Sequence, residues 1–128
     1  DYSFSGLKNA MRLLTEKKRF TNKQKGDLAA SFQRAVVDSL IIKFEKGIKE
    51  KSPKSILLGG GVANNTLLRK EVKALAKRYG LEAYLAPSHY TGDNAVMIAW
   101  AGWHTMSKAL EPKQFSKLVV NPQLRYEK

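Results

Sequence analysis

The sequence contains no cysteine. Disulfides, a thiolate nucleophile and a thiolate metal site are therefore excluded for these residues, and a reducing cytoplasm is the expected setting. Long apolar runs are also lacking, because the longest, residues 95–103, is far shorter than the ~20 residues that a membrane-spanning helix requires. We therefore expect a soluble, cytoplasmic protein that makes no membrane contact.

Acidic residues are few. The chain has 11 Asp and Glu against 23 Lys and Arg, which gives a formal charge of +12. This charge suggests an anionic partner such as a nucleic acid, with solvated lysine-rich helix faces as the alternative. The densest basic cluster surrounds Phe20 and consists of Lys17, Lys18, Arg19, Lys23 and Lys25. A solvated loop is the simpler interpretation of this cluster, whereas nucleic-acid contacts would produce a steep salt dependence of binding.

Length and composition indicate one globular domain. A chain of 128 residues with 43% hydrophobic content can bury a sizeable core. It opens at Asp1 without methionine and passes directly into alternating Tyr2 and Phe4, which is typical of a strand. We therefore expect an excised piece of a longer polypeptide.

The other elements are organised around one glycine-rich stretch. A short apolar run at residues 55–58 predicts a strand, three glycines follow, and Leu68, Val72 and Leu75 then repeat at helical spacing. Glycines at such a turn allow a positive φ and a close ligand approach, and free N–H groups favour an anion. Asn64 or Asn65 can cap the helix. A glycine-softened turn without any ligand is the alternative.

The elements before this turn are predicted to be helical. Ser5 is a candidate cap for a helix that carries Leu7, Met11 and Leu14. Thr21 and Gln24 have the spacing of a capping box, and a long helix runs from there to about Lys51. Its apolar positions predict packing against a sheet; they are Leu28, Ala29, Phe32, Val36, Val37, Leu40, Ile41, Phe44 and Ile48.

The second half continues the alternation of helix and strand. A helix is predicted to close at Tyr79-Gly80, followed by a strand at residues 81–86. The next helix is predicted at residues 95–110, and its first half is apolar almost all round, so we expect it to be buried. Residues 118–120 are a candidate edge strand in the tail.

Alternating strands and helices predict an α/β fold with parallel strands and crossover helices. Ligands of such sheets collect at the carboxyl ends of the strands. Three turns are expected at that edge: Ser5–Lys8, Gly59–Asn65 and residues 91–94. Asp93 lies at a helix start, where an aspartate either caps N–H groups or is free to bind a metal, and by itself capping is the simpler explanation.

Four segments in order resemble the universal tRNA threonylcarbamoyl transferase family, called TsaD in bacteria and Kae1 in archaea and eukaryotes. They are Asp1-Tyr2-Ser3-Phe4-Ser5-Gly6-Leu7-Lys8, then Ala29-Ala30-Ser31-Phe32-Gln33-Arg34-Ala35-Val36-Val37-Asp38, then Gly60-Gly61-Val62-Ala63-Asn64-Asn65-Thr66-Leu67-Leu68-Arg69, and finally Gly92-Asp93-Asn94-Ala95-Val96-Met97-Ile98-Ala99. The resemblance extends from residue 1 to about residue 104.

The resemblance implies a ribonuclease-H-like lobe of the actin, heat-shock protein 70 and sugar-kinase superfamily. Residues 1–110 would form a C-terminal lobe and residues 111–128 a tail. The implied reaction moves a threonylcarbamoyl group from threonylcarbamoyl-AMP to the exocyclic amine of the adenosine beside the anticodon, in tRNAs that read codons beginning with A. The whole protein would be the enzyme, and we expect this chain alone to be inactive.

The resemblance also implies the ligands and partners. Asn65 would contact the nucleotide, with Gly60 and Gly61 in the turn beside it, and Asp93 would bind one divalent metal ion, iron or zinc. The remaining metal ligands, a histidine pair, would come from a part absent here, and His89 and His104 do not match that pair. No catalytic nucleophile is implied. The implied partners are tRNA, threonylcarbamoyl-AMP or another adenine nucleotide, and TsaB-like and TsaE-like proteins.

One departure and two alternatives remain. The family loop commonly reads Cys-Thr-Asp-Asn, whereas this chain has Thr91-Gly92-Asp93-Asn94, which puts any role of the first two positions in doubt. The nucleotide-binding half of a related kinase would share the glycine turn but not the first and last motifs together. A non-catalytic partner subunit would be expected to lack the aspartate at position 93.

Overall fold

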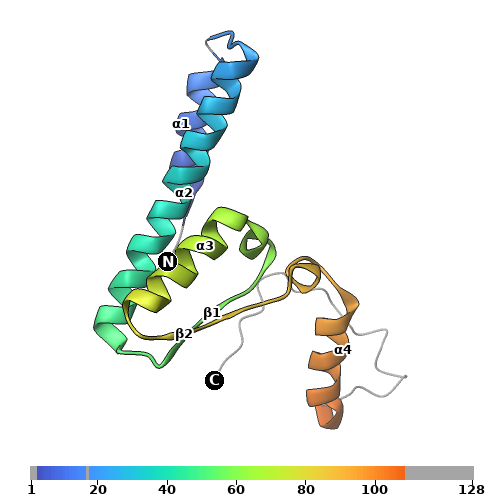
Figure 1. Cartoon of the computed structure of the whole chain (residues 1–128). Coiled ribbons are helices and arrows are strands. Elements are labelled where there is room, and N and C mark those ends of the chain that lie inside the picture. The colour runs from blue at the N-terminus through green and yellow to red at the C-terminus, as the bar shows by residue number, and fades with distance from the viewer. Residues whose placement is uncertain (1–2, 17, 109–128) are drawn as a thin grey trace, which may run out of the picture. The chain divides into compact units, whose positions relative to one another are not determined.

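The computed structural model describes residues 3–16 and 18–108, and the chain divides after Asp93 into two compact units. The first unit contains α1 (Ser5–Glu16), α2 (Asn22–Lys51), β1 (Ser55–Leu58), the 3-10 turn η1 (Gly61–Asn64), α3 (Thr66–Arg78), β2 (Glu82–Leu85) and the 3-10 turn η2 (Ser88–Tyr90) (Figure 1). The second unit contains α4 (Ala95–His104) and the 3-10 turn η3 (Met106–Lys108). The predicted division at residue 110 stays a prediction.

The long helix α2 has the ends that the sequence predicts. Thr21 is its N-cap and accepts from the N–H of Gln24, while the Gln24 side chain accepts from the Thr21 N–H at 2.9 Å. At the other end Ser52 adopts a left-handed conformation with φ 45°, and its N–H donates to the Ile48 carbonyl. The capping box is therefore confirmed, and so is the end of the helix near Lys51.

The two strands form a parallel pair joined by a crossover. β1 and β2 run in register from Ser55 opposite Glu82 to Leu58 opposite Leu85, and η1 and α3 connect them. This confirms the predicted α/β class and the parallel strands. Side chains alternate across the pair, so Ile56 and Leu58 are buried, whereas Leu57 on the opposite face is 77% exposed.

The core lies between α2, α3 and the inner face of the strands. Leu68, Val72 and Leu75 of α3 are almost completely buried, and Val37 and Ile48 are the buried residues of α2. The other apolar positions predicted for α2 are half-buried or exposed. A 30-residue helix is about 45 Å long. Two four-residue strands cannot cover that length, so the first half of α2 lies beside α1 instead (Figure 1).

The beginning of the chain differs from the prediction. Ser3 and Phe4 form no strand, and the remainder of that expected strand lies outside the described residues. α1 already starts at Ser5, because the Phe4 carbonyl accepts the first helical bond from the Lys8 N–H at 2.9 Å. Ser5 is thus inside the helix and is not its cap. A strand needs a neighbour, and in the described part of the chain the only sheet consists of β1 and β2.

The second unit also corrects the prediction. α4 ends at His104 and not near residue 110, and none of its residues is buried, with Ile98 68% and Trp103 69% exposed. Among the described residues of this unit only η3 adjoins α4, and one 3-10 turn cannot cover a helix that is apolar all round. The expected strand at residues 118–120 lies outside the described residues. No described helix is long and apolar enough to cross a membrane.

Candidate functional site

The three glycines at residues 59–61, which we call the glycine turn, leave the backbone at the end of β1 accessible. Gly60 has φ +89°, a left-handed conformation that glycine adopts without strain. A Cβ added at Gly59 or Gly60 would meet no atom within 4 Å, and one at Gly61 would meet only the Thr91 carbonyl oxygen, at 4.0 Å. The backbone N–H groups of Gly59 and Gly60 donate to no described residue. The turn therefore presents accessible backbone donors, as a ligand would require.

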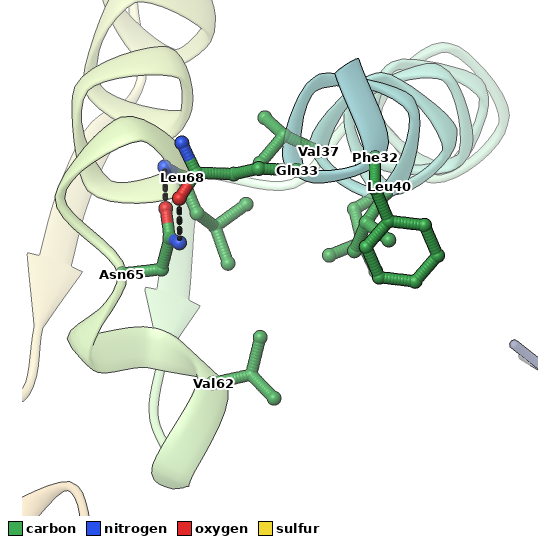
Figure 2. A pocket seen from close by; sticks show the side chains of 8 residues that line it. Phe32, Gln33, Val37, Leu40, Val62, Asn65 and Leu68 are labelled. Carbon is green, nitrogen blue, oxygen red and sulfur yellow. Dashed lines mark hydrogen bonds between the residues drawn. The ribbon is translucent and has the colours of Figure 1, made fainter. Parts of the chain in front are cut away.

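Asn65 caps α3, and both the oxygen and the nitrogen of its side-chain amide form hydrogen bonds. Its Oδ1 accepts from the Leu68 N–H at 2.9 Å, and its Nδ2 donates to Oε1 of Gln33 at 3.0 Å (Figure 2). The predicted cap is therefore Asn65, while the neighbouring Asn64 is the exposed last residue of η1. The second hydrogen of Nδ2 and the second lone pair of Oδ1 stay available to another partner.

A pocket of about 230 Å³ lies beside Asn65. We call it the site pocket, and Figure 2 shows Val62 and Asn65 on one side of it and α2 residues on the other. Its walls are almost entirely apolar, and Gln33 and Asn65 are its polar residues; the full lining is Phe32, Gln33, Val36, Val37, Leu40, Val62, Asn65 and Leu68. The pocket therefore combines apolar walls with the two hydrogen-bonded amides.

An ion pair fixes α2 against α3 next to this pocket. Arg34 bonds Asp38 on its own helix at 2.9 Å and Glu71 on α3 at 3.0 Å. The hydrogen bond that Arg34 donates to Asp38, the negative charge of Asp38 and the hydrogen bond to Glu71 raise the pKa of Arg34. Because Arg34 follows Gln33 directly, the bridge helps to hold the amide of Gln33 opposite Asn65.

Arg69 connects η1, which follows the glycine turn, with the segment after β2. Its Nη1 donates to the Ala63 carbonyl at 3.0 Å and to the Ala86 carbonyl at 2.9 Å. Ala86 in turn donates its N–H to the Leu58 carbonyl at 3.0 Å. Arg69 is the last residue of the third motif, but the sequence pattern predicts no role for it. No local pattern indicates a hydrogen bond to a carbonyl 17 residues away.

Replacing Arg69 with alanine is expected to destabilise this edge of the sheet. The two carbonyls would lose a charged donor, which typically costs about 1–3 kcal/mol when the acceptors are partly buried. Urea unfolding of the variant measures the loss, and Lys70→Ala on the exposed side of the same helix is the matched control. Equal stabilities of the two variants would contradict a bridging role for Arg69.

Two of the three turns predicted to share an edge do meet. Thr91 is 4% exposed, its Oγ1 donates to the Ser88 carbonyl at 2.7 Å, and its own carbonyl lies next to Gly61. The third segment, Ser5–Lys8, is the first turn of α1 and makes no hydrogen bond to either of the other two among the described residues. The expectation is not confirmed for that segment, since no strand precedes it among the described residues.

Asp93 is exposed and follows the buried Thr91 by two positions. Its carboxylate forms no hydrogen bond or ion pair with any described residue. The cap of α4 is Asn94, whose Oδ1 accepts from the Met97 N–H at 3.0 Å, so the capping explanation for Asp93 is wrong. His89 lies in η2 against the ring of Tyr90, and His104 lies at the end of α4 against Trp100. No group of three metal-binding side chains occurs among the described residues.

Comparison with known proteins adds the following. Residues 1–100 match the family model described as TsaD, tRNA N6-adenosine threonylcarbamoyltransferase. The chain is 38% identical over 121 residues to the curated protein of that name from Thermosipho africanus, covering 94% of the chain and 37% of the relative. It is 44% identical over 104 residues to the Carboxydothermus hydrogenoformans protein, covering 81% and 31%. A third relative, from Porphyromonas gingivalis, is 41% identical over 129 residues, covering 94% and 38%. The chain thus spans between 31% and 38% of the lengths of these relatives.

Proposed function

The chain belongs to the TsaD family, and we propose that it supplies the nucleotide-contacting turn and one metal ligand of a tRNA N6-adenosine threonylcarbamoyltransferase. The reaction would join the exocyclic amine of the adenosine beside the anticodon to the carbamoyl carbon. The bond from that carbon to the phosphate oxygen of threonylcarbamoyl-AMP would break, and the amine would lose a proton. The single observation that carries the proposal is the match of residues 1–100.

The nucleotide end of threonylcarbamoyl-AMP is assigned to the glycine turn and the site pocket. The free N–H groups of Gly59 and Gly60 can donate to a phosphate, and the absence of side chains at Gly60 and Gly61 lets it approach. Adenine has apolar faces and a hydrogen-bonding edge, which fit apolar walls such as Phe32 and Val62 and the amide of Asn65.

The metal is assigned one ligand in this chain, Asp93. An exposed carboxylate without a protein partner is a suitable oxygen donor for divalent iron or zinc. The described residues offer no complete site, so the remaining ligands would come from outside them. When bound, such an ion polarises the carbamoyl carbonyl and stabilises its developing negative charge.

The finer fold and the partners belong to the same proposal. The parallel pair with its crossover helix supports a ribonuclease-H-like lobe of the actin, heat-shock protein 70 and sugar-kinase superfamily. The exposed side chains of Leu57 and Tyr84 on the outer strand face support a second covering layer, as parallel sheets of this kind have on both faces. TsaB-like and TsaE-like partners rest on the resemblance alone. Neither a related kinase nor a non-catalytic subunit is favoured by any observation, since the family model covers the first and last motifs together.

Asn65 provides the test of the nucleotide site. We expect Asn65→Ala to weaken binding of a threonylcarbamoyl-adenylate analogue by about 1–3 kcal/mol, since a polar group of the ligand would lose its partner. The measurement is calorimetry on a full-length protein that carries this chain.

Two further variants separate the loss of ligand binding from the loss of the helix cap. Asn65→Asp keeps an oxygen that can cap α3 but loses the Nδ2 donor, so it should retain stability yet bind the analogue more weakly. Asn64→Ala, one position earlier and exposed, should change neither property. Wild-type affinity in both Asn65 variants would reduce that residue to a helix cap.

A further inference from the structure

A second hollow, which shares only Phe32 with the site pocket, lies between α1 and the first half of α2. Its volume is about 690 Å³, three times that of the site pocket, and we call it the hairpin hollow. Apolar side chains line it: Met11 from α1, Phe20 from the segment between the helices, and Leu28 and Phe32 from α2. Neither Phe20 nor Phe32 stacks on another described aromatic ring. Both rings are half-buried and line the hollow, where a flat ligand could stack on Phe20.

Cations also line this hollow. They are Lys18, Arg19 and Lys25, all exposed. Among the described residues none of the three forms an ion pair. Five other basic residues do have carboxylate partners: Arg12, Arg34, Lys46, Lys49 and Arg78. Between residues 18 and 33 the chain carries four Lys and Arg but a single carboxylate, Asp27. The segment around the α1–α2 connection therefore carries a cluster of cations without carboxylate partners among the described residues.

The start of α2 is fixed by a capping box beside the hollow. Phe20 directly precedes the Thr21 cap, and Lys25 follows Gln24, the other half of the capping box. The two reciprocal bonds of that box fix the entry into α2, and with it the positions of Phe20 and Lys25. Aromatic and cationic side chains thus line the same hollow.

We propose that the hairpin hollow binds a single-stranded segment of the tRNA substrate. Unpaired lysines and arginines contact backbone phosphates, and an aromatic face accepts an unstacked base, a combination that is characteristic of single-stranded RNA sites. An acidic protein segment could pair with the same cations, and the test below includes the outcome that would identify it. That the RNA is tRNA rests on the proposed function. The location of the site rests on the residues that line the hairpin hollow.

The test compares two triple variants that lose the same charge. Lys18→Gln, Arg19→Gln and Lys25→Gln remove the cations of the hollow, whereas Lys70→Gln, Lys73→Gln and Lys77→Gln remove exposed lysines of α3. The probe is a fluorescent, unmodified transcript of a tRNA that reads codons beginning with A, titrated against a full-length protein at several salt concentrations. We expect the hollow variant to bind at least about tenfold more weakly and its log–log salt slope to fall by about 2, as lost phosphate contacts require. The α3 variant should change both values much less.

Phe20→Leu tests the aromatic platform separately. It keeps apolar bulk in the hollow, so folding should be preserved, but it removes the ring on which a base stacks. We expect at least about fivefold weaker binding with an unchanged salt slope, since stacking is not electrostatic.

Three outcomes are decisive. Equal loss in the two triple variants would overturn the proposal, because the effect would then be one of net charge. Retained tRNA affinity in the hollow variant together with lost binding of a partner protein would make the hollow a protein interface and also overturn it. A wild-type protein that binds tRNA but transfers no threonylcarbamoyl group would instead contradict the proposed function and leave the RNA site standing.

Discussion

Replacing Asp93 with asparagine is expected to abolish threonylcarbamoyl transfer while the protein stays folded. The carboxylate is exposed and has no partner among the described residues, so no described contact depends on its charge. An amide is a much poorer ligand for divalent iron or zinc than a carboxylate, so the metal should be lost or held in the wrong geometry. The measurements are metal content, tRNA modification and melting temperature of the full-length variant.

The neighbouring residue supplies the control. Asn94 caps α4, so Asn94→Ala should cost about 1 kcal/mol of stability, whereas Asp93→Asn and Asp93→Ala should cost almost nothing. Variants at the two positions thus separate a loss of stability from a loss of bound metal. Normal metal content and normal transfer in Asp93→Asn would remove Asp93 from the proposed site.

Local signals in the sequence predicted the parts of the site that depend on neighbouring residues. The capping box at Thr21, a positive φ in the glycine turn and a cap at Asn64 or Asn65, which proved to be Asn65, each depend on contacts within a few residues. Alternation of short apolar runs with helical periods was enough to predict the parallel strands. The meeting of the Gly61 and Thr91 segments followed from that topology, since parallel strands end at the same edge.

Other parts of the site could not be predicted because they depend on distant partners. Gln33 meets Asn65 across 32 residues, and Arg69 reaches Ala86 across 17, and no periodicity reports such pairs. The burial of α4 was predicted from its apolar composition. Such a composition indicates that a helix packs against other elements, but it does not indicate which elements those are. Among the described residues no such cover is present.

The 128-residue chain by itself is expected to fold but neither to retain iron or zinc through dialysis nor to transfer a threonylcarbamoyl group. The first unit has its own buried core, centred on Leu68, Val72 and Leu75, which supports independent folding. A stable iron or zinc site needs three or four protein ligands, whereas this chain is assigned only Asp93, and the described residues contain no cluster of three. Metal analysis after dialysis and a transfer assay with threonylcarbamoyl-AMP and tRNA measure the two properties, with a full-length protein as the positive control. Stoichiometric metal in the isolated chain would contradict the ligand count unless the chain self-associates and pools several Asp93 side chains, which Asp93→Asn and the oligomeric state in solution would reveal together.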